Sequence, residues 1–282
     1  MHTIASCAEL RQIIQSKKNA ELSVAFVPTM GNLHEGHLTL VDAAKQHADY
    51  VVASIFVNPM QFGENEDLDA YPRTLSDDST ALKRHGCDLL FAPGAREVYP
   101  NGITEETRIE VPSLGRNHCG SSRPGHFVGV ATVVAKLFNM VQPDVAIFGQ
   151  KDFQQLAVIR KMVRDLCMPI EIIGIPTSRE PSGLARSSRN GYLSEDEKRT
   201  ASTLFQVLSR SKQQLEKGDS DFAHIRSEAR QVLEAAGFKC DYFNIAHPLT
   251  LDSATAKDKE LVILAAAWLG RTRLIDNITV SR

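Results

Sequence analysis

Two histidines spaced three residues apart form the most suggestive chemical pattern in the chain. His34 and His37 lie in PTMGNLHEGH, residues 28–37, between an apolar run and a segment with helical spacing. If the helix has begun there, both imidazoles lie on one face. The N–H groups at a helix N-terminus bind phosphate, and neighbouring imidazoles can stabilise charge that develops on phosphorus. We therefore predict a nucleotide site, although spacing alone is equally consistent with two surface histidines.

Two common nucleotide motifs are excluded by the same stretch. Gly31 and Gly36 have the spacing of a phosphate-binding P-loop, but His37 stands where that loop requires Lys. No GxGxxG follows the first apolar run, which disfavours a hydride-transferring oxidoreductase. Two histidines are also too few ligands for a zinc site.

Polar residues also follow a second apolar run, in FGQKDFQQ, residues 148–155. Lys151 and Asp152 come directly after it, and Gln155 follows one helical turn later. A lysine can neutralise phosphate, and a carboxylate can hold a ribose hydroxyl or a metal. The alternative is an ordinary solvated helix cap.

Three further stretches carry groups suited to substrate binding. SIFVNPMQF ends in the amides Asn58 and Gln61, which can orient a small polar substrate. SSRPGHF, residues 121–127, and ARSSRN, residues 185–190, offer basic side chains for an anion clamp. A mobile basic loop could close over phosphate, but such loops are more often simply solvated.

Apolar runs alternate with helical patterns from the N-terminus to residue 176. Continuous apolar runs such as residues 50–57 are typical of strands buried on both faces of a parallel sheet. We predict a doubly wound, Rossmann-like α/β fold with at least five strands. Its ligands should lie beyond the strands' carboxyl ends, in the loops after Val27, Val57 and Phe148. Capping boxes are predicted at Ser6 with Glu9 and at Ser194 with Glu197.

A polar segment, residues 177–194, separates this pattern from the rest of the chain. We predict a Rossmann-like domain over residues 1–176 and a smaller α+β domain with a nucleotide-closing loop over residues 177–282. The second domain should contain a long helix over residues 194–218, another over 222–237, and strands at 238–246, 260–269 and 272–280.

Composition restricts the class of protein. Lys and Arg total 32 against 34 Asp and Glu, so no basic field favours nucleic acid. The longest apolar run, residues 261–269, is far shorter than the roughly 20 residues of a membrane span. The N-terminus lacks the order of a secretory signal, so we expect a cytoplasmic protein. The five cysteines show neither a CxxC pair nor a disulfide pattern, and we expect free thiols.

The motifs together closely resemble the pantothenate synthetase family. The resemblance rests on PTMGNLHEGH, SIFVNPMQF, YPRT, SSRPGHFVGV, FGQKDFQQL and LARSSRN in this order, and it covers nearly the whole chain. The first motif is similar to the HIGH signature of the wider nucleotidyltransferase superfamily. The resemblance implies ATP-dependent condensation of (R)-pantoate with β-alanine to pantothenate, AMP and pyrophosphate, through a pantoyl adenylate. It also implies Mg²⁺ accompanying ATP, no dedicated protein metal site, and a homodimer.

The resemblance also implies roles for individual residues. His37, His34 and Lys151 would be catalytic, with His37 as proton donor and as a candidate relay for the β-alanine amine proton. Gln61 and Gln155 would bind pantoate. The residues implied in ATP binding are Met30, Gly31, Asn32, Leu33, His34, Glu35, Gly36, His37, Gly149, Gln150, Lys151, Asp152, Ser178, Arg186, Ser187, Ser188 and Arg189. The sequence departs from the family pattern at Ser182, where Asp is common, and at Arg186, where an aliphatic residue is usual.

Three alternatives remain open. Another HIGH-type adenylyltransferase would keep AMP in its product, whereas the ligase would release it. An aminoacyl-tRNA synthetase is disfavoured by the balanced charge. A catalytically silent nucleotide-binding protein would use the histidines only for ligand contact.

Overall fold

The computed structural model describes residues 1–63 and 68–282 and divides the chain into two compact units. The first unit contains residues 1–115, 123–150 and 155–176, and the second contains residues 116–122, 151–154 and 177–282. Two short segments assigned above to the first domain therefore group with the second. Their contacts explain this: the thiol of Cys119 lies 2.9 Å from the Tyr242 hydroxyl, and Asn277 Nδ2 donates to the Lys151 carbonyl over 2.8 Å.

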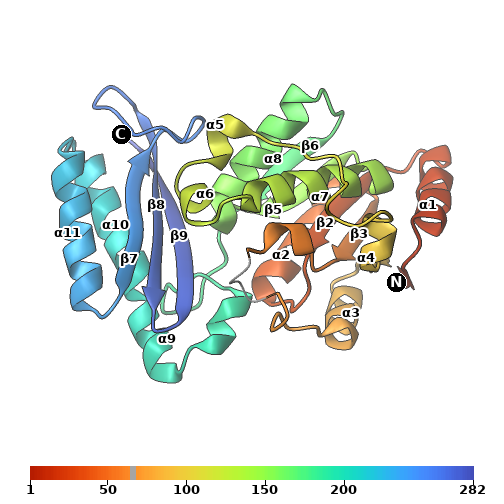
Figure 1. Ribbon diagram of the computed structural model, residues 1–282, viewed down its shortest axis with the longest axis horizontal. Helices are drawn as coiled ribbons and strands as arrows, with labels where there is room; N and C mark the ends of the chain where they lie inside the picture. The colour runs from red at the N-terminus through yellow and green to blue at the C-terminus, as the bar shows by residue number, and fades with distance from the viewer. Residues whose placement is uncertain (64–67) are drawn as a thin grey trace. The chain divides into compact units, whose positions relative to one another are not determined.

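The first unit is built on a six-stranded parallel sheet, as predicted. Its strand order is β1-β4-β3-β2-β5-β6. The strands are β1 (His2–Ile4), β2 (Val24–Thr29), β3 (Tyr50–Ile55), β4 (Leu89–Phe91), β5 (Val145–Gly149) and β6 (Glu171–Ile175). The helices are α1 (Cys7–Asn19), α2 (Glu35–His47), α3 (Leu75–Arg84), α4 (Ala95–Val98), α5 (Pro112–Gly115), α7 (His126–Val141) and most of α8 (Phe153–Asp165), with the 3-10 turn η1 (Pro59–Gln61). A second 3-10 turn, η2 (Gln150–Asp152), begins in this unit, and residues 151–154 belong to the second. The elements can be followed in Figure 1.

Alternate residues of the central strands bury two different cores. Ala25 and Val27 of β2 pack with Val41 of α2 on one face of the sheet. On the other, the Phe138 ring of α7 makes edge contacts with Phe26 and Phe148, each at a centroid distance of 6.3 Å. Because side chains alternate along a strand, the apolar run of β2 is needed to fill both cores. The sheet therefore fixes where β2, β3 and β5 end.

The second unit contains an antiparallel sheet in the order β7-β8-β9. Its elements are α6 (Cys119–Ser122), η3 (Ser188–Tyr192), α9 (Glu195–Ala201), α10 (Thr203–Glu216), α11 (Phe222–Ala235), β7 (Lys239–Ala246), β8 (Glu260–Leu269) and β9 (Thr272–Ser281). Figure 1 shows α10 and α11 side by side against this sheet. Leu208 and Leu233 of these helices share a core with Phe243 and Ile263 of the strands. The predicted α+β composition of this part of the chain is correct.

Two local predictions are wrong, and one strand was not predicted. Ser6 makes no side-chain cap, because the carboxylate of Glu97 accepts from Cys7 N over 2.7 Å and takes the place of a local cap. The helix expected over residues 194–218 is two helices, α9 and α10, with Ser202 between them donating to the Arg199 carbonyl. Strand β1 was not predicted, since three residues are too few to show a period. The capping box of Ser194 and Glu197 is confirmed.

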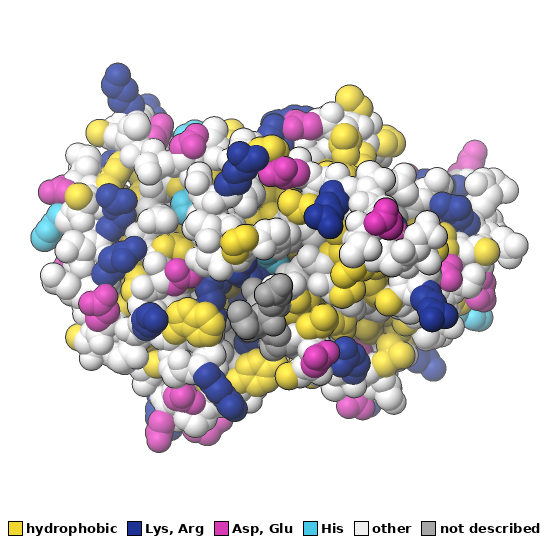
Figure 2. All heavy atoms as spheres, viewed as in Figure 1, with side chains coloured by type: hydrophobic (Ala, Val, Ile, Leu, Met, Phe, Trp, Pro, Cys, Tyr) yellow, Lys and Arg dark blue, Asp and Glu magenta, His cyan; other side chains and the backbone are white. Residues whose placement is uncertain are grey.

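The surface agrees with the balanced charge. Figure 2 shows acidic and basic side chains interspersed over the visible face. Over the ranges 1–63 and 68–282, no helix has the length and apolar character that crossing a membrane requires. The five cysteines are free thiols.

Candidate active site

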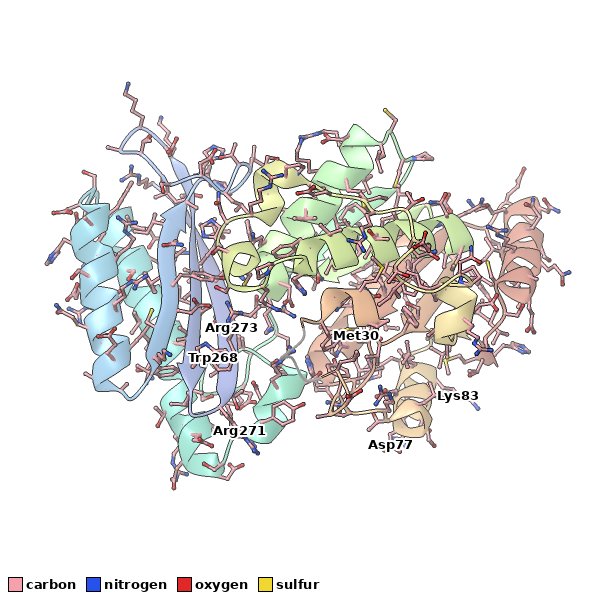
Figure 3. The ribbon with its side chains drawn as sticks, in the orientation of Figure 1. Met30, Asp77, Lys83, Trp268, Arg271 and Arg273 are labelled. Carbon is pink, nitrogen blue, oxygen red and sulfur yellow. The ribbon has the colours of Figure 1, made fainter. Side chains whose placement is uncertain are left out.

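The loop after β2 turns sharply before α2 begins. Gly31 has a φ of +82° and Asn32 a φ of +50°, so two successive residues adopt left-handed conformations. A Cβ on Gly31 would also lie 3.0 Å from both Asp78 Oδ2 and Ile55 Cγ2. Glycine is therefore required at position 31 by conformation and by space. Met30, labelled in Figure 3, opens this loop.

His34 and His37 cap the start of α2 reciprocally. Gly36 N donates to Nδ1 of His34 over 3.0 Å, and His34 N donates to Nδ1 of His37 over 3.3 Å. The two rings lie together, with centroids 4.1 Å apart. An Nδ1 that accepts from an N–H carries no proton, so each ring, held in this way, has its proton on Nε2. The predicted convergence of the two imidazoles at a helix N-terminus is thus present, with both Nε2–H groups as donors.

A buried carboxylate from α3 holds the same loop. Asp78, 3% exposed, accepts from Asn32 N at 2.9 Å and from Leu33 N at 2.8 Å. The hydroxyl of Thr74 donates to the same carboxylate over 3.1 Å. The main-chain N–H groups of the loop are therefore fixed by a residue far away in the sequence. Sequence analysis missed Asp78, although a carboxylate one turn before the buried Leu82, on the apolar face of the helix, was a usable signal.

The turn after β3 presents Gln61 beside the loop after β2. Asn58, 1% exposed, donates through Nδ2 to Gln61 Oε1 over 3.1 Å, and Gln61 Nε2 lies 2.8 Å from the sulfur of Met30. Asn58 Oδ1 in turn accepts from the Tyr99 hydroxyl at 2.7 Å. Burial, with the charge of Glu106, raises the pKa of Tyr99, which keeps its hydroxyl protonated as the donor. The Gln61 amide, which is predicted to bind pantoate, is thus oriented by Asn58 at its oxygen and by Met30 at its nitrogen.

Helix α7 packs against the turn η1 that carries Gln61. The ring of His126 bonds through Nδ1 to the Gln61 carbonyl at 2.8 Å, while its Nε2 lies 3.0 Å from the Arg123 guanidinium. Because a guanidinium only donates, His126 Nε2 accepts and Nδ1 carries the proton. A Cβ on Gly129 would lie 2.2 Å from the Met60 carbonyl, so only glycine lets α7 approach so closely. These contacts give Arg123 and His126 a structural task in addition to the anion binding considered above.

The end of β5 lies next to β2 in the sheet, as the strand pairing shows. Gly149 ends the strand, and Gln150 donates from Nε2 to the Gly174 carbonyl over 3.2 Å. On α8, the two adjacent glutamines differ. The amide of Gln154 bonds to Cys119 N and Asn117 O, whereas that of Gln155 makes no hydrogen bond within residues 1–63 and 68–282. Gln155 therefore retains a side chain available for substrate.

In the second unit, Lys151 is partly buried and close to Asp152. Its side chain is 19% exposed, and its Nζ lies 3.7 Å from Asp152 Oδ2. The main-chain carbonyl of Lys151 accepts from Asn277 of β9. Both residues lie in η2, and Asp152 is its last residue. They therefore follow β5 directly, as predicted.

Residues 178–186 of the second unit form a small hairpin. Arg186 N donates to the Ser178 carbonyl over 3.0 Å, and Glu180 N donates to the Leu184 carbonyl over 2.8 Å. At its tip the Ser182 hydroxyl accepts from Leu184 N at 3.4 Å, a turn bond that an aspartate could also provide. The departure at Ser182 therefore preserves the turn.

The basic Ser-rich segment directly follows this hairpin. Ser187 caps η3 by accepting from Arg189 N over 3.3 Å, with Ser188 between them. Asn190, 7% exposed, ties η3 back to the hairpin by donating to the Ala185 carbonyl over 3.0 Å. The Arg186 side chain, which is half-buried, makes no hydrogen bond or ion pair within the described part of the chain. These hydrogen bonds join the segment to the hairpin of the second unit, and its closure over phosphate stays a prediction.

Three residues that anchor the hairpin were also missed. Arg179 pairs with Asp276, and Asn277 is its neighbour on β9. The signal was the alternation Leu274, Asp276, Ile278, Val280, in which a carboxylate takes an inward position.

As for metals, no group of three His, Cys, Asp or Glu that could hold an ion is found among the residues outside 64–67.

Comparisons with known proteins agree with one another. The family model for pantoate-beta-alanine ligase matches residues 2–279. Pantothenate synthetases from Marinobacter nauticus and Pseudomonas fluorescens are 56% identical over 282 residues and 58% identical over 278 residues, covering 100% and 99% of this chain and 100% and 97% of their own.

Solved structures give the same result. The pantothenate synthetase of Thermus thermophilus has a TM-score of 0.92 and 46% identity, with 100% of both chains covered. The pantoate-beta-alanine ligase of Francisella tularensis, solved with beta-gamma ATP and beta-alanine, has a TM-score of 0.83 and 33% identity, covering 99% of this chain and 97% of that one.

Proposed function

Since the chain belongs to the pantoate–β-alanine ligase family and catalyses the AMP-forming ligation of pantoate to β-alanine, we propose that the reaction passes through a pantoyl adenylate. A pantoate carboxylate oxygen attacks the α-phosphorus of ATP, and the bond to pyrophosphate breaks. The β-alanine nitrogen then attacks the acyl carbon, the bond to AMP breaks, and the amine loses a proton. Pantothenate and AMP leave.

The reciprocal caps of His34 and His37 are the observation that carries this proposal. They place two Nε2–H donors at the N-terminus of α2, a 13-residue helix whose dipole favours anions. We assign these donors, with the main chain of residues 30–37, to the ATP phosphates. Preorganised donors of this kind stabilise the charge that grows on the phosphates as pyrophosphate leaves.

The same tautomer separates two roles considered for His37. A ring whose Nδ1 accepts from His34 N and whose Nε2 carries the proton is a donor. We therefore assign His37 to hydrogen-bond donation, since a neutral ring cannot give up its Nε2 proton. The tautomer favours this role over that of the base for the β-alanine amine, which is about 99.9% protonated at pH 7 if its pKa is near 10.

Pantoate is assigned to the amides of Gln61 and Gln155. Gln61 is nearly buried and held by Asn58, so it can bind a small polar molecule without rearranging. Uncharged amides can bind a carboxylate and hydroxyls without introducing a competing charge.

We also propose nucleotide-binding roles for residues of the second unit. Lys151 would neutralise phosphate, Asp152 would contact the nucleotide, and Ser178 and Arg186 to Arg189 would close over it. Because Mg²⁺ is commonly held by substrate phosphates and water, we propose that the substrate is MgATP, with no resident metal. We also propose a cytoplasmic homodimer, which sedimentation at several protein concentrations would test.

Exchange of labelled pyrophosphate into ATP tests the proposed intermediate. We expect exchange that requires pantoate and proceeds without β-alanine, since a reversible adenylate forms before the amine enters. Exchange that requires β-alanine would contradict the two-step order. If no free AMP is released and the AMP group of ATP stays in the product, the reaction is instead that of an adenylyltransferase.

A further inference from the structure

Two adjacent residues of β9 connect parts of the second unit that are far apart in sequence. Asn277, 6% exposed, donates from Nδ2 to the carbonyl of Lys151 over 2.8 Å, across 126 positions of sequence. Its neighbour Asp276, 4% exposed, binds Arg179 at the base of the hairpin of residues 178–186. One strand thus holds both the lysine and the basic segment that follows the hairpin.

The contact between Arg179 and Asp276 is bidentate and buried. NH1 lies 2.6 Å from Oδ2 and NH2 lies 2.9 Å from Oδ1, and the Asp276 side chain is 2% exposed. Arg179 NH1 also donates to the Gly183 carbonyl over 3.1 Å, and its guanidinium lies 3.7 Å from the centre of the Phe205 ring. Two parallel hydrogen bonds and a stacked face fix the orientation of an arginine far better than one contact.

Glycine at the hairpin tip completes this anchor. Gly183 has a φ of +92°, and a Cβ there would lie 2.6 Å from Cδ1 of Phe205. The hairpin therefore packs directly on the ring that Arg179 covers. Its position relative to β9 is set by packing, by hydrogen bonds and by charge together.

We propose that Asp276 and Asn277 are positioning residues, which fix the main chain of Lys151 and the base of the hairpin in one frame through neighbouring positions of β9. The inference rests on the proposed role of Lys151 in adenylation. Because Asn277 donates to the Lys151 carbonyl, the main chain of the lysine is held in one position during adenylation. A lysine side chain is long and flexible, so the location of its main chain limits where the ammonium can be.

The variant Asn277→Asp tests this link, because it replaces the donor facing the Lys151 carbonyl with an acceptor at the same size. Without β-alanine, each active site should form one pyrophosphate, so the amplitude of that first turnover counts folded enzyme and its rate constant reports adenylation. We expect the rate constant to fall about 10- to 100-fold, as for a displaced catalytic group, with the amplitude retained. Asn277→Ala, which adds no charge, serves if Asn277→Asp does not fold. Asn139→Asp, whose amide donates to the Ala135 carbonyl on α7, is the matched control and should not change the rate constant.

A double-mutant cycle with Lys151→Ala separates this inference from the function on which it rests. If Asn277 acts through Lys151, its substitution should cost less than about threefold once the lysine side chain is gone. An equal loss in both backgrounds, or no loss in either, would overturn the inference. If Lys151→Ala alone leaves the rate constant unchanged, the proposed role of Lys151 is itself wrong.

Discussion

The side-chain nitrogen of Gln61 lies 2.8 Å from the sulfur of Met30, so the loops that follow two adjacent strands of the sheet meet at their side chains. Sulfur is a weak acceptor, and a buried amide gains more from a stronger one. The contact holds Gln61 in place while leaving its N–H groups suited to bind an oxygen of pantoate.

Replacing Gln61 should therefore weaken pantoate binding. In Gln61→Glu the donor is lost and a charge is placed where a carboxylate substrate binds. We expect the KM for pantoate to rise about 10- to 100-fold, since a hydrogen bond to a charged group contributes about 1.5–3 kcal/mol. Steady-state kinetics with pantoate varied would measure this. The matched variant Gln15→Glu, on the exposed side of α1, should leave KM unchanged; an unchanged KM in Gln61→Glu would remove Gln61 from the substrate site.

Removing the Asp78 carboxylate should destabilise the protein. Asp78→Ala leaves Asn32 N and Leu33 N without their acceptor. We expect the free energy of unfolding to fall by about 2–4 kcal/mol, because two partly buried main-chain donors lose their charged acceptor. Denaturant unfolding would measure it. Asp77→Ala, the adjacent and exposed position labelled in Figure 3, is the control and should change the free energy by less than about 0.5 kcal/mol. Equal losses in the two variants would show that the loop does not depend on Asp78.

Arg189→Ala should reduce turnover more than it reduces stability. The hairpin and η3 are held by Arg179, Ser187 and Asn190, so the fold of this segment should survive the change. We expect kcat to fall at least about tenfold, as when one charged donor to a reacting phosphate is removed. Parallel kinetics and thermal unfolding would show the difference, with Arg199→Ala on the exposed face of α9 as the control. Unchanged kcat would remove Arg189 from the nucleotide site.

His118 should make stability depend on pH. It donates from Nε2 to the Leu251 carbonyl at 2.8 Å and accepts at Nδ1 from Asn244 at 2.9 Å, so the neutral ring fits both partners. Burial is the largest cause lowering the pKa of His118 below 6.5, opposed by the Leu251 bond and the charge of Asp252. The unfolded chain therefore binds more protons as pH falls below about 6.5, and folding free energy is lost until the pH passes the folded pKa.

Unfolding measured between pH 7.5 and 5 would test this contribution. The variant His118→Gln should lose less stability than the parent chain as pH falls, whereas His224→Gln, on the outside of α11, should follow the parent. The same slope in all three proteins would contradict the assignment.

Local patterns predicted what depends on neighbours in sequence. The positions of His34 and His37 at a helix start follow from three-residue spacing, and the strands follow from continuous apolar runs. The box of Ser194 and Glu197 was found for the same reason.

Contacts between residues far apart in sequence could not be predicted from local patterns. The Asp78 carboxylate meets Asn32 N across 46 positions, and Asn277 meets Lys151 across 126. The cap expected from Ser6 is absent, and the first N–H of the helix, that of Cys7, donates instead to the distant carboxylate of Glu97. A polar residue at an inward position, such as Asp276, can signal that a partner exists, but only the fold identifies that partner.

Transfer of oxygen from pantoate to AMP tests the central claim most directly. Pantoate labelled with ¹⁸O in its carboxylate would be converted with MgATP and β-alanine, and the AMP analysed by mass spectrometry. If the carboxylate attacks the α-phosphorus and the amine then displaces AMP at the acyl carbon, each AMP carries one ¹⁸O. AMP without label, or label in pyrophosphate, would contradict the pantoyl adenylate and the roles assigned to His34, His37 and Lys151.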